Sequence, residues 1–347
     1  MKIKKNEGWR GANYCRRMRT KQLKNDQRMQ RIVSYILSSQ RCWMIVLSFI
    51  IGHLSLSHAV AQEFGMRWLY SPQADETQQI WFKRSIHMGE LTKKAVLSIA
   101  SEGRYIVYVN GYNISSDLFS SNPRGVIGIR DYSIENYLTE GTNTIAVWYS
   151  PVNYSHRQLY AVLSGQWQSG GSFYIGNDKG WTCHVANART LPDGSEEIDG
   201  SRYLSNWKEF DIKENSFMLS EWKPAVVASD LEPAIVTFSH HECYGYHAVR
   251  ILKRAKVSQN GRTLTYDFGQ QFDGWVRVTM RGMKKGDVIQ VNGLRYVCKG
   301  GSDDQACRRF TIGTAGMAHI TLPAGRSRSN ITTVEAISIT DNPNYKP

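Results

Sequence analysis

Hydrophobic and polar residues alternate along short segments of the chain, and this pattern predicts β-strands. In the segment 95–114, two apolar runs are joined by Ser101-Glu102-Gly103 and followed by Asn110-Gly111. One face of the first run carries Ala95, Leu97 and Ile99, and one face of the second carries Tyr105, Val107 and Val109. Asn-Gly allows the positive φ angles of a tight hairpin turn. With a further strand at Thr144–Tyr149, which we expect to pair in the same sheet, this part of the chain predicts half of a β-sandwich.

A second region of alternation lies toward the carboxyl terminus. In Trp275–Met280, Val276, Val278 and Met280 would point inward, while Arg277 and Thr279 would point outward. The segments 287–291 and 318–322 continue the pattern, and Lys284-Lys285-Gly286-Asp287 is typical of a hairpin connection. No long segment has helical periodicity, so the sequence predicts an all-β protein with two tandem β-sandwiches.

Four motifs follow one another along the chain, namely AVLSIASEGRYIVYVNGYNI at 95–114, DYSIENYLTEGTNTIAVWY at 131–149, IGNDKGW at 175–181 and YDFGQQFDGW at 266–275. In this order they resemble the amino-terminal, non-catalytic region of glycoside hydrolase family 78, the bacterial α-L-rhamnosidases. The resemblance runs from about Arg67 to Ile339. It implies a jelly-roll, galactose-binding-like sandwich followed by a concanavalin-like sandwich.

Pattern and resemblance together divide the chain into four segments. These are a basic region and signal peptide at 1–61, a first sandwich at 62–182, an irregular connecting segment at 183–232 and a second sandwich at 233–347. We expect Trp68 and Trp81 to pack under the edge of the first sandwich. Trp207 and Trp222 would anchor the connecting segment, because an irregular segment needs large apolar contacts to offset its ordering entropy.

The amino-terminal region has the order of a secretory signal peptide. Met1–Trp43 contains 12 Lys and Arg and two acidic residues, which gives it +10 of the formal net charge of +13. The apolar run Cys42–Gly52 and then Ala59-Val60-Ala61 follow, so we expect cleavage before Gln62 and a secreted or periplasmic protein with no membrane span. An uncleaved anchor is the alternative, and translation could begin at Met29. The rest of the chain has no basic run with interleaved aromatics, which argues against nucleic acid as a partner.

The remaining cysteines suit an oxidising compartment. Cys298 and Cys307 flank a polar, glycine-containing loop, which predicts a local disulfide between them. Whether Cys183 pairs with Cys243 stays open. His240-His241-Glu242-Cys243, with His247 nearby, contains zinc-ligand side chains, but the spacing differs from H-E-x-x-H and favours ordinary sheet histidines.

The sequence contains no pattern for nucleophilic catalysis or for a phosphate loop. In the resembling family, the catalytic carboxylates lie on a helical barrel that follows the sandwiches, so no catalytic residue carries over to this chain. The resemblance also implies a calcium-holding Asp-Asn pair, which is matched here by Glu102 and Gly103. Gly103 lacks the amide oxygen, so we expect neither calcium nor any other cofactor.

The sequence therefore predicts an exported, non-catalytic protein that binds a plant or envelope glycan, which could contain rhamnose. Affinity would come from an aromatic face and a few polar groups, for which the candidates are Glu102, Asn110, Tyr112 and Trp148. Two alternatives stay open. One is a component of an α-L-rhamnosidase-like hydrolase, either truncated or acting with a separate catalytic chain, and the other is a structural envelope protein.

Overall fold

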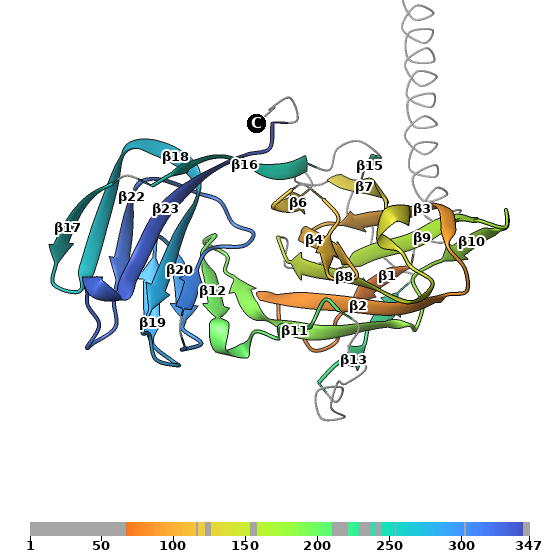
Figure 1. The fold of residues 1–347 in the computed structure, drawn as a ribbon, viewed down its shortest axis with the longest axis horizontal. Coiled ribbons are helices and arrows are strands. Elements are labelled where there is room, and N and C mark those ends of the chain that lie inside the picture. The colour runs from red at the N-terminus through yellow and green to blue at the C-terminus, as the bar shows by residue number, and fades with distance from the viewer. Residues whose placement is uncertain are drawn as a thin grey trace, which may run out of the picture. The chain divides into compact units, whose positions relative to one another are not determined.

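The computed structural model describes residues 67–115, 117–121, 126–152, 158–209, 221–228, 237–239, 244–253, 255–301 and 303–342. These residues form two β-sheets and three short 3-10 helices, and this part of the chain contains no α-helix. The helices are η1 Glu135–Tyr137, η2 Gly200–Arg202 and η3 Arg328–Asn330. None of the described helices has the length and apolar character needed to cross a membrane. The predicted all-β class with tandem sandwiches is confirmed (Figure 1).

The smaller sheet forms the outer layer of the first sandwich. Among the described residues it has seven strands, with β10 pairing with β9 beside the main order β14-β1-β9-β3-β7-β15. Their bounds are β14 Val226–Ala228, β1 Trp68–Tyr70, β9 Leu159–Trp167, β3 Thr92–Ser101, β7 Val126–Ser133, β15 Thr237–Ser239 and β10 Ser172–Ile175. The pairing is antiparallel except between β7 and β15.

The larger sheet runs through both sandwiches. Twelve of its strands close into a hydrogen-bonded ring, because β12 pairs with β20 and also with β11. In ring order they are β12 Glu196–Asp199, β20 Leu294–Val297, β19 Val288–Val291, β22 Gly313–Thr321, β18 Thr263–Arg281, β23 Ile331–Thr340, β16 Tyr244–Leu252, β6 Phe119–Ser121, β4 Arg104–Val109, β8 Gly141–Ser150, β2 Gln78–Met88 and β11 Trp181–Thr190. Outside the ring, β13 Lys223–Pro224, β17 Lys256–Asn260, β21 Asp303–Ala306 and β5 Tyr112–Asn113 extend the sheet.

Two apolar cores lie on opposite faces of the strands β2, β4 and β8. The first fills the space between the two layers of the first sandwich, and it includes Phe82, Val107 and Val147. The second lies on the other face and continues into the second sandwich, and it includes Trp81 and Trp148. A strand buried on both faces has a near-continuous apolar run, which explains the sequence Ile145-Ala146-Val147-Trp148-Tyr149 in β8.

The local predictions from alternation are confirmed. Ala95, Leu97 and Ile99 of β3 are fully buried, and Asn110 and Gly111 have φ angles of 49° and 83°, which suit a tight hairpin turn between β4 and β5. The pairing of the strands differs from expectation in one respect. β3 lies in the outer layer, whereas β4 and β8 pair in the larger sheet, so the segment 95–149 supplies both layers of the sandwich.

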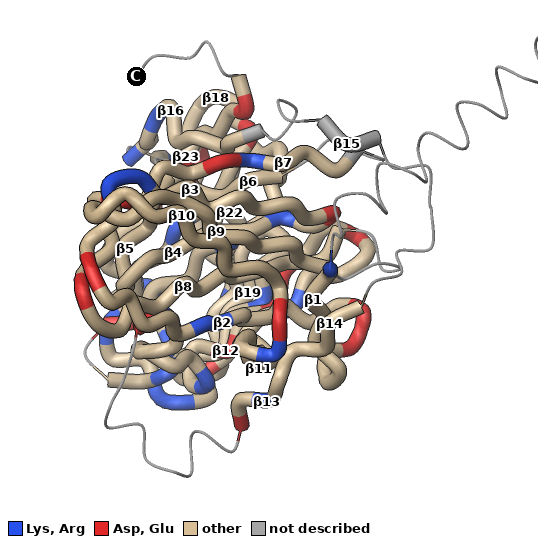
Figure 2. Tube along the Cα trace, turned by 90° about the vertical axis from the view of Figure 1, so that its right-hand side faces the viewer, with Lys and Arg blue, Asp and Glu red and all other residues tan. Residues whose placement is uncertain are grey.

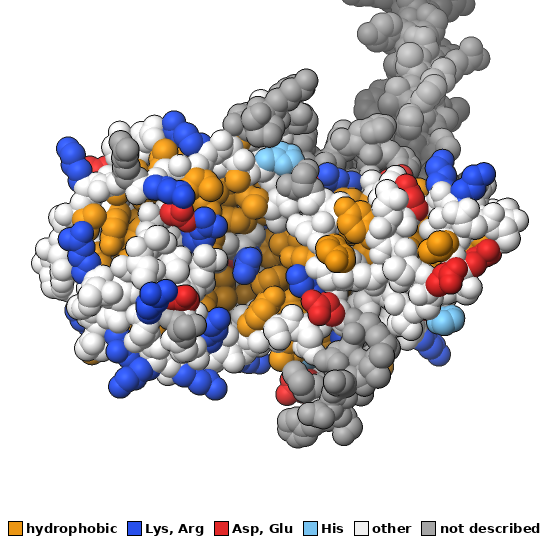
Figure 3. Space-filling view, viewed as in Figure 1, with side chains coloured by type: hydrophobic (Ala, Val, Ile, Leu, Met, Phe, Trp, Pro, Cys, Tyr) orange, Lys and Arg blue, Asp and Glu red, His pale blue; other side chains and the backbone are white. Residues whose placement is uncertain are grey.

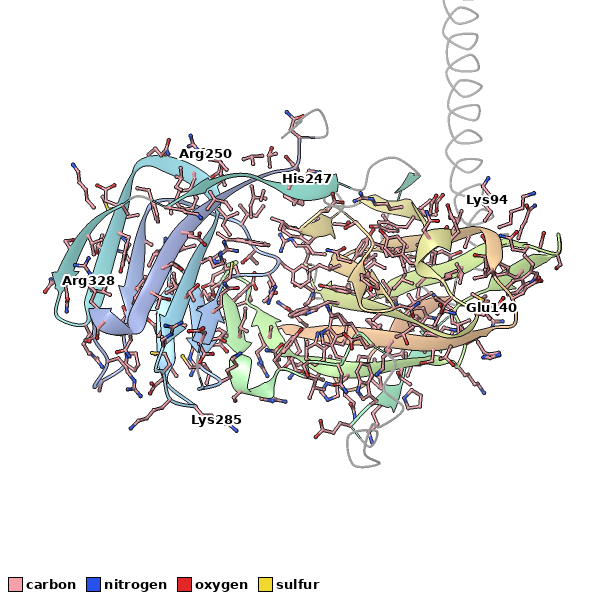
Figure 4. The ribbon with its side chains drawn as sticks, in the orientation of Figure 1. Lys94, Glu140, His247, Arg250, Lys285 and Arg328 are labelled. Carbon is pink, nitrogen blue, oxygen red and sulfur yellow. The ribbon has the colours of Figure 1, made fainter. Side chains whose placement is uncertain are left out.

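Two strands join the sandwiches at opposite places in the ring. β16 pairs with β23 and with β6, while β12 pairs with β20 and with β11. Beside β16, the buried Asp117 carboxylate forms ion pairs with Arg130 and with Nδ1 of His247, the latter at 3.1 Å. Figure 4 labels His247 on β16. These contacts fix the position of β16 against the first sandwich.

The segment 183–232, which we expected to be irregular, also contributes strands to the sheets. β13 pairs with β11, and β14 pairs with β1. Trp207 and Trp222 are buried, as predicted for anchors of this segment. Trp68 and Trp81 of the first sandwich are buried as well, and Trp81 packs in the second core. Residues 1–66, which include the expected signal peptide, lie outside the described residues.

Candidate functional site

The strand β18 contains a wide bulge at the motif Phe268-Gly269-Gln270-Gln271. Asp267 pairs with Met317 of β22, and Phe272 pairs with Ala315, so five steps along β18 oppose only two along β22. Gly269 has a φ of 72°, a conformation that glycine adopts readily. The extra residues cannot join the ladder of backbone hydrogen bonds, and bulges of this kind redirect side chains.

The bulge lines a pocket of about 740 Å³ in the second sandwich. This volume lies within the range of about 300–1,000 Å³ that is usual for small-molecule sites. The polar side chains around the pocket come from four parts of the chain, namely Asp267, Gln270 and Gln271 of β18, Asn292, Arg308, and Thr314 and His319 of β22. Met317, which is 43% exposed, adds apolar surface.

Some of these polar groups hold the pocket together. Asn292 donates from Nδ2 to the Met317 carbonyl at 2.7 Å and accepts from the His319 N–H at 2.7 Å. Arg308 donates to the Gly194 carbonyl at 3.2 Å and also to the Asn292 carbonyl. Burial acts to lower the pKa of Arg308, although Glu196 and Asp193 nearby oppose this effect. These side chains therefore form the wall of the pocket.

Other groups in the pocket remain available to a ligand. Gln270 and Gln271 are exposed and make no side-chain hydrogen bond with any described residue. Asp267 accepts the Gly269 N–H through Oδ1 at 2.8 Å, and His319 contacts the Thr265 hydroxyl through Nδ1 at 3.2 Å. The second carboxylate oxygen and Nε2 can therefore face a ligand. The pocket presents two amides, a carboxylate and an imidazole, which are side chains that hydrogen-bond hydroxyl groups.

The loop that carries Arg308 is fixed by a buried carboxylate. Glu196 of β12 is fully buried. Its Oε2 accepts the Arg309 N–H at 3.0 Å, and its Oε1 accepts the N–H groups of Phe310 and Thr311 at 2.9 and 2.6 Å and the Thr311 hydroxyl at 2.7 Å. Hydrogen bonds to a charged acceptor are stronger than those between neutral groups. This loop therefore has a defined position relative to the joining strand β12.

None of the four residues proposed from the sequence as carbohydrate-binding lines this pocket. Trp148 is only 3% exposed, and its Nε1 donates to Oε1 of Gln79 at 2.8 Å. Its ring packs edge-on against Trp81 and Trp207, with centroids 5.8 Å apart in both cases. The structure thus places Trp148 in the core.

The other three proposed residues lie near the ends of β4. Asn110 donates to the Tyr137 carbonyl at 2.8 Å and accepts from the Thr144 N–H at 2.8 Å, so its amide supports the hairpin. Tyr112 is 67% exposed, with its ring 6.5 Å from that of Tyr137. Glu102 is half-buried at the opposite end of β4 from Asn110 and Tyr112. The structure therefore does not bring these residues together into one site.

The position that corresponds to the family's calcium-binding amide cannot hold a side chain in this structure. A Cβ on Gly103 would overlap the Ser150 carbonyl oxygen and the Tyr149 ring. The backbone N–H of Gly103 donates to the Ser101 hydroxyl at 3.0 Å. The close packing around Gly103 does not fit a calcium site built from side chains at 102 and 103.

Cys298 and Cys307 are both free thiols in this structure, which therefore does not support the predicted disulfide. Burial raises the pKa of each thiol to about 12. His240 to Cys243 lie outside the described residues, and His247 is the one member of that histidine-rich stretch whose contacts the structure gives. No group of three or more potential metal ligands occurs among the described residues.

Sequence reasoning missed the pocket because its residues come from distant parts of the chain. The available signal was the motif Phe268–Gly274, in which two glycines interrupt the alternation of β18. The motif leads directly into the core, since Trp275 is 6% exposed and donates to the Thr311 carbonyl at 2.8 Å. The same motif also forms the wall of the pocket.

Comparisons with known proteins show the fold. No protein-family model and no curated protein matches the sequence. Among solved structures, the described fold is similar to the α-L-rhamnosidase from Dictyoglumus thermophilum, with a TM-score of 0.70 and 18% identity over 80% of this chain and 35% of that one. The Streptomyces avermitilis α-L-rhamnosidase complexed with L-rhamnose gives 0.65 and 17%, over 77% of this chain and 29% of that one.

A fungal enzyme, the α-L-rhamnosidase from Aspergillus terreus, is similar to the same degree. Its TM-score is 0.65 at 18% identity, over 80% of this chain and 36% of that one. This chain therefore spans about a third of the length of these rhamnosidases, and it shares their fold over that part.

Proposed function

We propose that the protein binds carbohydrate through the pocket of the second sandwich. The observation that carries the proposal is the bulge of β18, which removes Gln270 and Gln271 from the strand ladder and places them in a pocket of about 740 Å³. Amide and carboxylate groups around a partly apolar cavity suit the alternating hydroxyl and C–H surfaces of a sugar.

The proposed role is that of an exported, non-catalytic glycan-binding protein at the cell envelope or outside the cell. The fold shared with α-L-rhamnosidases supports a carbohydrate partner, and it also favours a second candidate function as a component of a rhamnosidase-like hydrolase. Figure 2 shows Lys and Arg interspersed with Asp and Glu along the described strands, a distribution that suits a neutral ligand better than a nucleic acid.

Calorimetric titration of the full chain with L-rhamnose and with rhamnose-containing oligosaccharides tests the proposal. Gln271→Ala removes one available amide, and we expect its dissociation constant to rise about 2- to 10-fold, the effect of losing a net hydrogen bond. Gln166→Ala is a matched control, since Gln166 is an exposed glutamine of β9 outside the pocket. Equal affinities for Gln271→Ala and the unmodified chain would exclude the pocket as the site.

Hydrolytic activity is a separate measurement on the same preparation. The proposal expects no release of sugar from an aryl rhamnoside. Activity that survives repurification and disappears on replacement of a single Asp or Glu would establish the second candidate function in place of the first.

A further inference from the structure

A second group of side chains, two of them exposed and two half-buried, lies beside the buried tryptophans of the larger sheet. It consists of Tyr108, Tyr203, Lys208 and Arg309, and we call it the tyrosine–arginine cluster. On the face drawn in Figure 3, hydrophobic side chains gather in a hollow between the two sandwiches, with Lys and Arg side chains among them. None of the four residues lines the pocket described above.

The two cations of the cluster lie over aromatic rings. The Arg309 guanidinium is 5.4 Å from the centroid of the Trp148 ring, and the Lys208 ammonium is 4.8 Å from that of Tyr108. Neither side chain forms an ion pair with a carboxylate of the described residues, and Arg309 is exposed. Both charges can therefore pair with an anion from solution.

The tyrosines give the cluster a fixed aromatic surface. Tyr203 is 42% exposed, while its ring contacts the buried rings of Trp81 and Trp148 at centroid distances of 6.0 and 6.5 Å. Tyr108 packs edge-on against Trp207 at 5.4 Å. Burial raises the pKa of Tyr108, while the nearby charge of Arg309 acts to lower it.

The backbone of Arg309 is also fixed. Its N–H donates to the buried Glu196 carboxylate at 3.0 Å, so the Arg309 side chain extends from a backbone position that is held in place. A cation held beside a rigid, partly exposed aromatic ring is a combination that recognises a sugar carrying a negative charge. The ring provides a stacking surface for the apolar face of the pyranose, and the cation pairs with its acid group.

We propose that the tyrosine–arginine cluster binds an acidic sugar residue, with its carboxylate or sulfate on Arg309 and Lys208 and its pyranose ring on Tyr203. This inference deepens the proposed glycan-binding function by adding a second, anionic subsite to the pocket. A carboxylate and a sulfate are both anions that can pair with the same two cations. Testing a uronate and a sulfated oligosaccharide separately shows which of the two groups the cluster binds.

The test is calorimetric titration of the full chain with an oligogalacturonate, a sulfated galactan oligosaccharide and a neutral galactan oligosaccharide of equal length. We expect at least one acidic ligand to bind more tightly than the neutral one, and its affinity to fall as salt is raised. Arg309→Gln should weaken that binding by about 10-fold or more, as expected for a lost charge-assisted hydrogen bond.

Arg250→Gln is the matched control, because Arg250 is an exposed arginine on β16, labelled in Figure 4. Tyr203→Phe should retain acidic binding and Tyr203→Ala should lose most of it, which identifies stacking as the contribution of this ring. Equal loss of affinity in Arg250→Gln and Arg309→Gln would overturn the site, since it would show only the effect of net charge.

The two sites can fail independently. If Gln271→Ala weakens acidic binding and Arg309→Gln does not, the acidic ligand occupies the pocket and the inference is wrong. Binding of neutral sugars without any binding of the acidic ones also overturns the inference, while it leaves the function proposed for the pocket intact.

Discussion

Gly103 connects the two layers of the first sandwich, and replacing it tests the packing at that crossing. A Cβ at this position would overlap the backbone carbonyl of Ser150 and the ring of Tyr149, and Tyr149 is fully buried. Neither group is the free end of a flexible side chain, so β8 itself would have to shift. We therefore expect Gly103→Ala to lower the free energy of unfolding by about 3 kcal/mol, the upper end of the usual cost of overpacking.

The matched control is Gly89→Ala, because a Cβ at Gly89 meets no atom within 4 Å. Reduced entropy of the unfolded chain should make that substitution neutral or stabilising by up to about 1 kcal/mol. Chemical and thermal unfolding of the two variants of the full chain measure the difference, and about 3 kcal/mol corresponds to a melting temperature lower by roughly 6–12 °C. Equal unfolding midpoints for both variants would refute the packing argument.

Gly103→Asn distinguishes the structure from the family resemblance. The resemblance associates an amide at this position with calcium, whereas the packing leaves no room for the side chain. We expect Gly103→Asn to be at least as destabilised as Gly103→Ala, and calcium not to restore its melting temperature. A stable Gly103→Asn variant whose melting temperature rises with calcium would contradict this expectation.

Two further predictions concern buried polar groups of the second core. Glu196→Gln should lower the free energy of unfolding by about 1.5–3 kcal/mol. When the amide oxygen of the glutamine accepts the Phe310 N–H, its NH2 group faces the Arg309 N–H, which is then left without an acceptor. Urea unfolding measures the loss, and Glu197→Gln, at a half-buried neighbouring position, is the control. Since burial raises the pKa of Cys298 and Cys307 to about 12, their contribution to stability is complete below about pH 8.5 and is lost as the pH rises through 12. Both thiols should therefore stay protonated and resist alkylation at pH 8 until the protein unfolds, and rapid native-state labelling of the fully buried Cys298 would contradict this prediction.

The strand faces and the hairpin turn of the first sandwich could be predicted from the sequence, because they depend on residues that are close together along the chain. Alternation places Ala95, Leu97 and Ile99 on one face of β3, and Asn110-Gly111 specifies the turn between β4 and β5 through backbone conformation alone. Alternation does not specify which strands pair. For that reason β3 and β4, which are consecutive, could not be assigned to separate layers in advance.

The same limit explains why Trp148 was proposed as a binding residue. β8 is buried on both faces, so its sequence has no polar alternation that would separate a core tryptophan from an exposed one. The second face is covered by residues more than fifty positions away, such as Trp207 and Phe310. Similarly, the pocket needs Arg308 and His319 beside the bulge of β18, and their approach is a consequence of the ring of strands.

The pocket and the tyrosine–arginine cluster share one support, the loop that begins after β21. Arg308 lines the pocket, while the next residue, Arg309, lies over Trp148 in the cluster. The chain bends at Arg309 and Phe310, and the two arginine side chains contact different groups, so a single loop supplies a cation to each site. Glu196 of β12 holds that loop by its backbone N–H groups. A substitution at Arg309 should therefore affect the acidic subsite alone, whereas one at Glu196 should change affinity at both sites, because it moves the backbone from which both arginines extend.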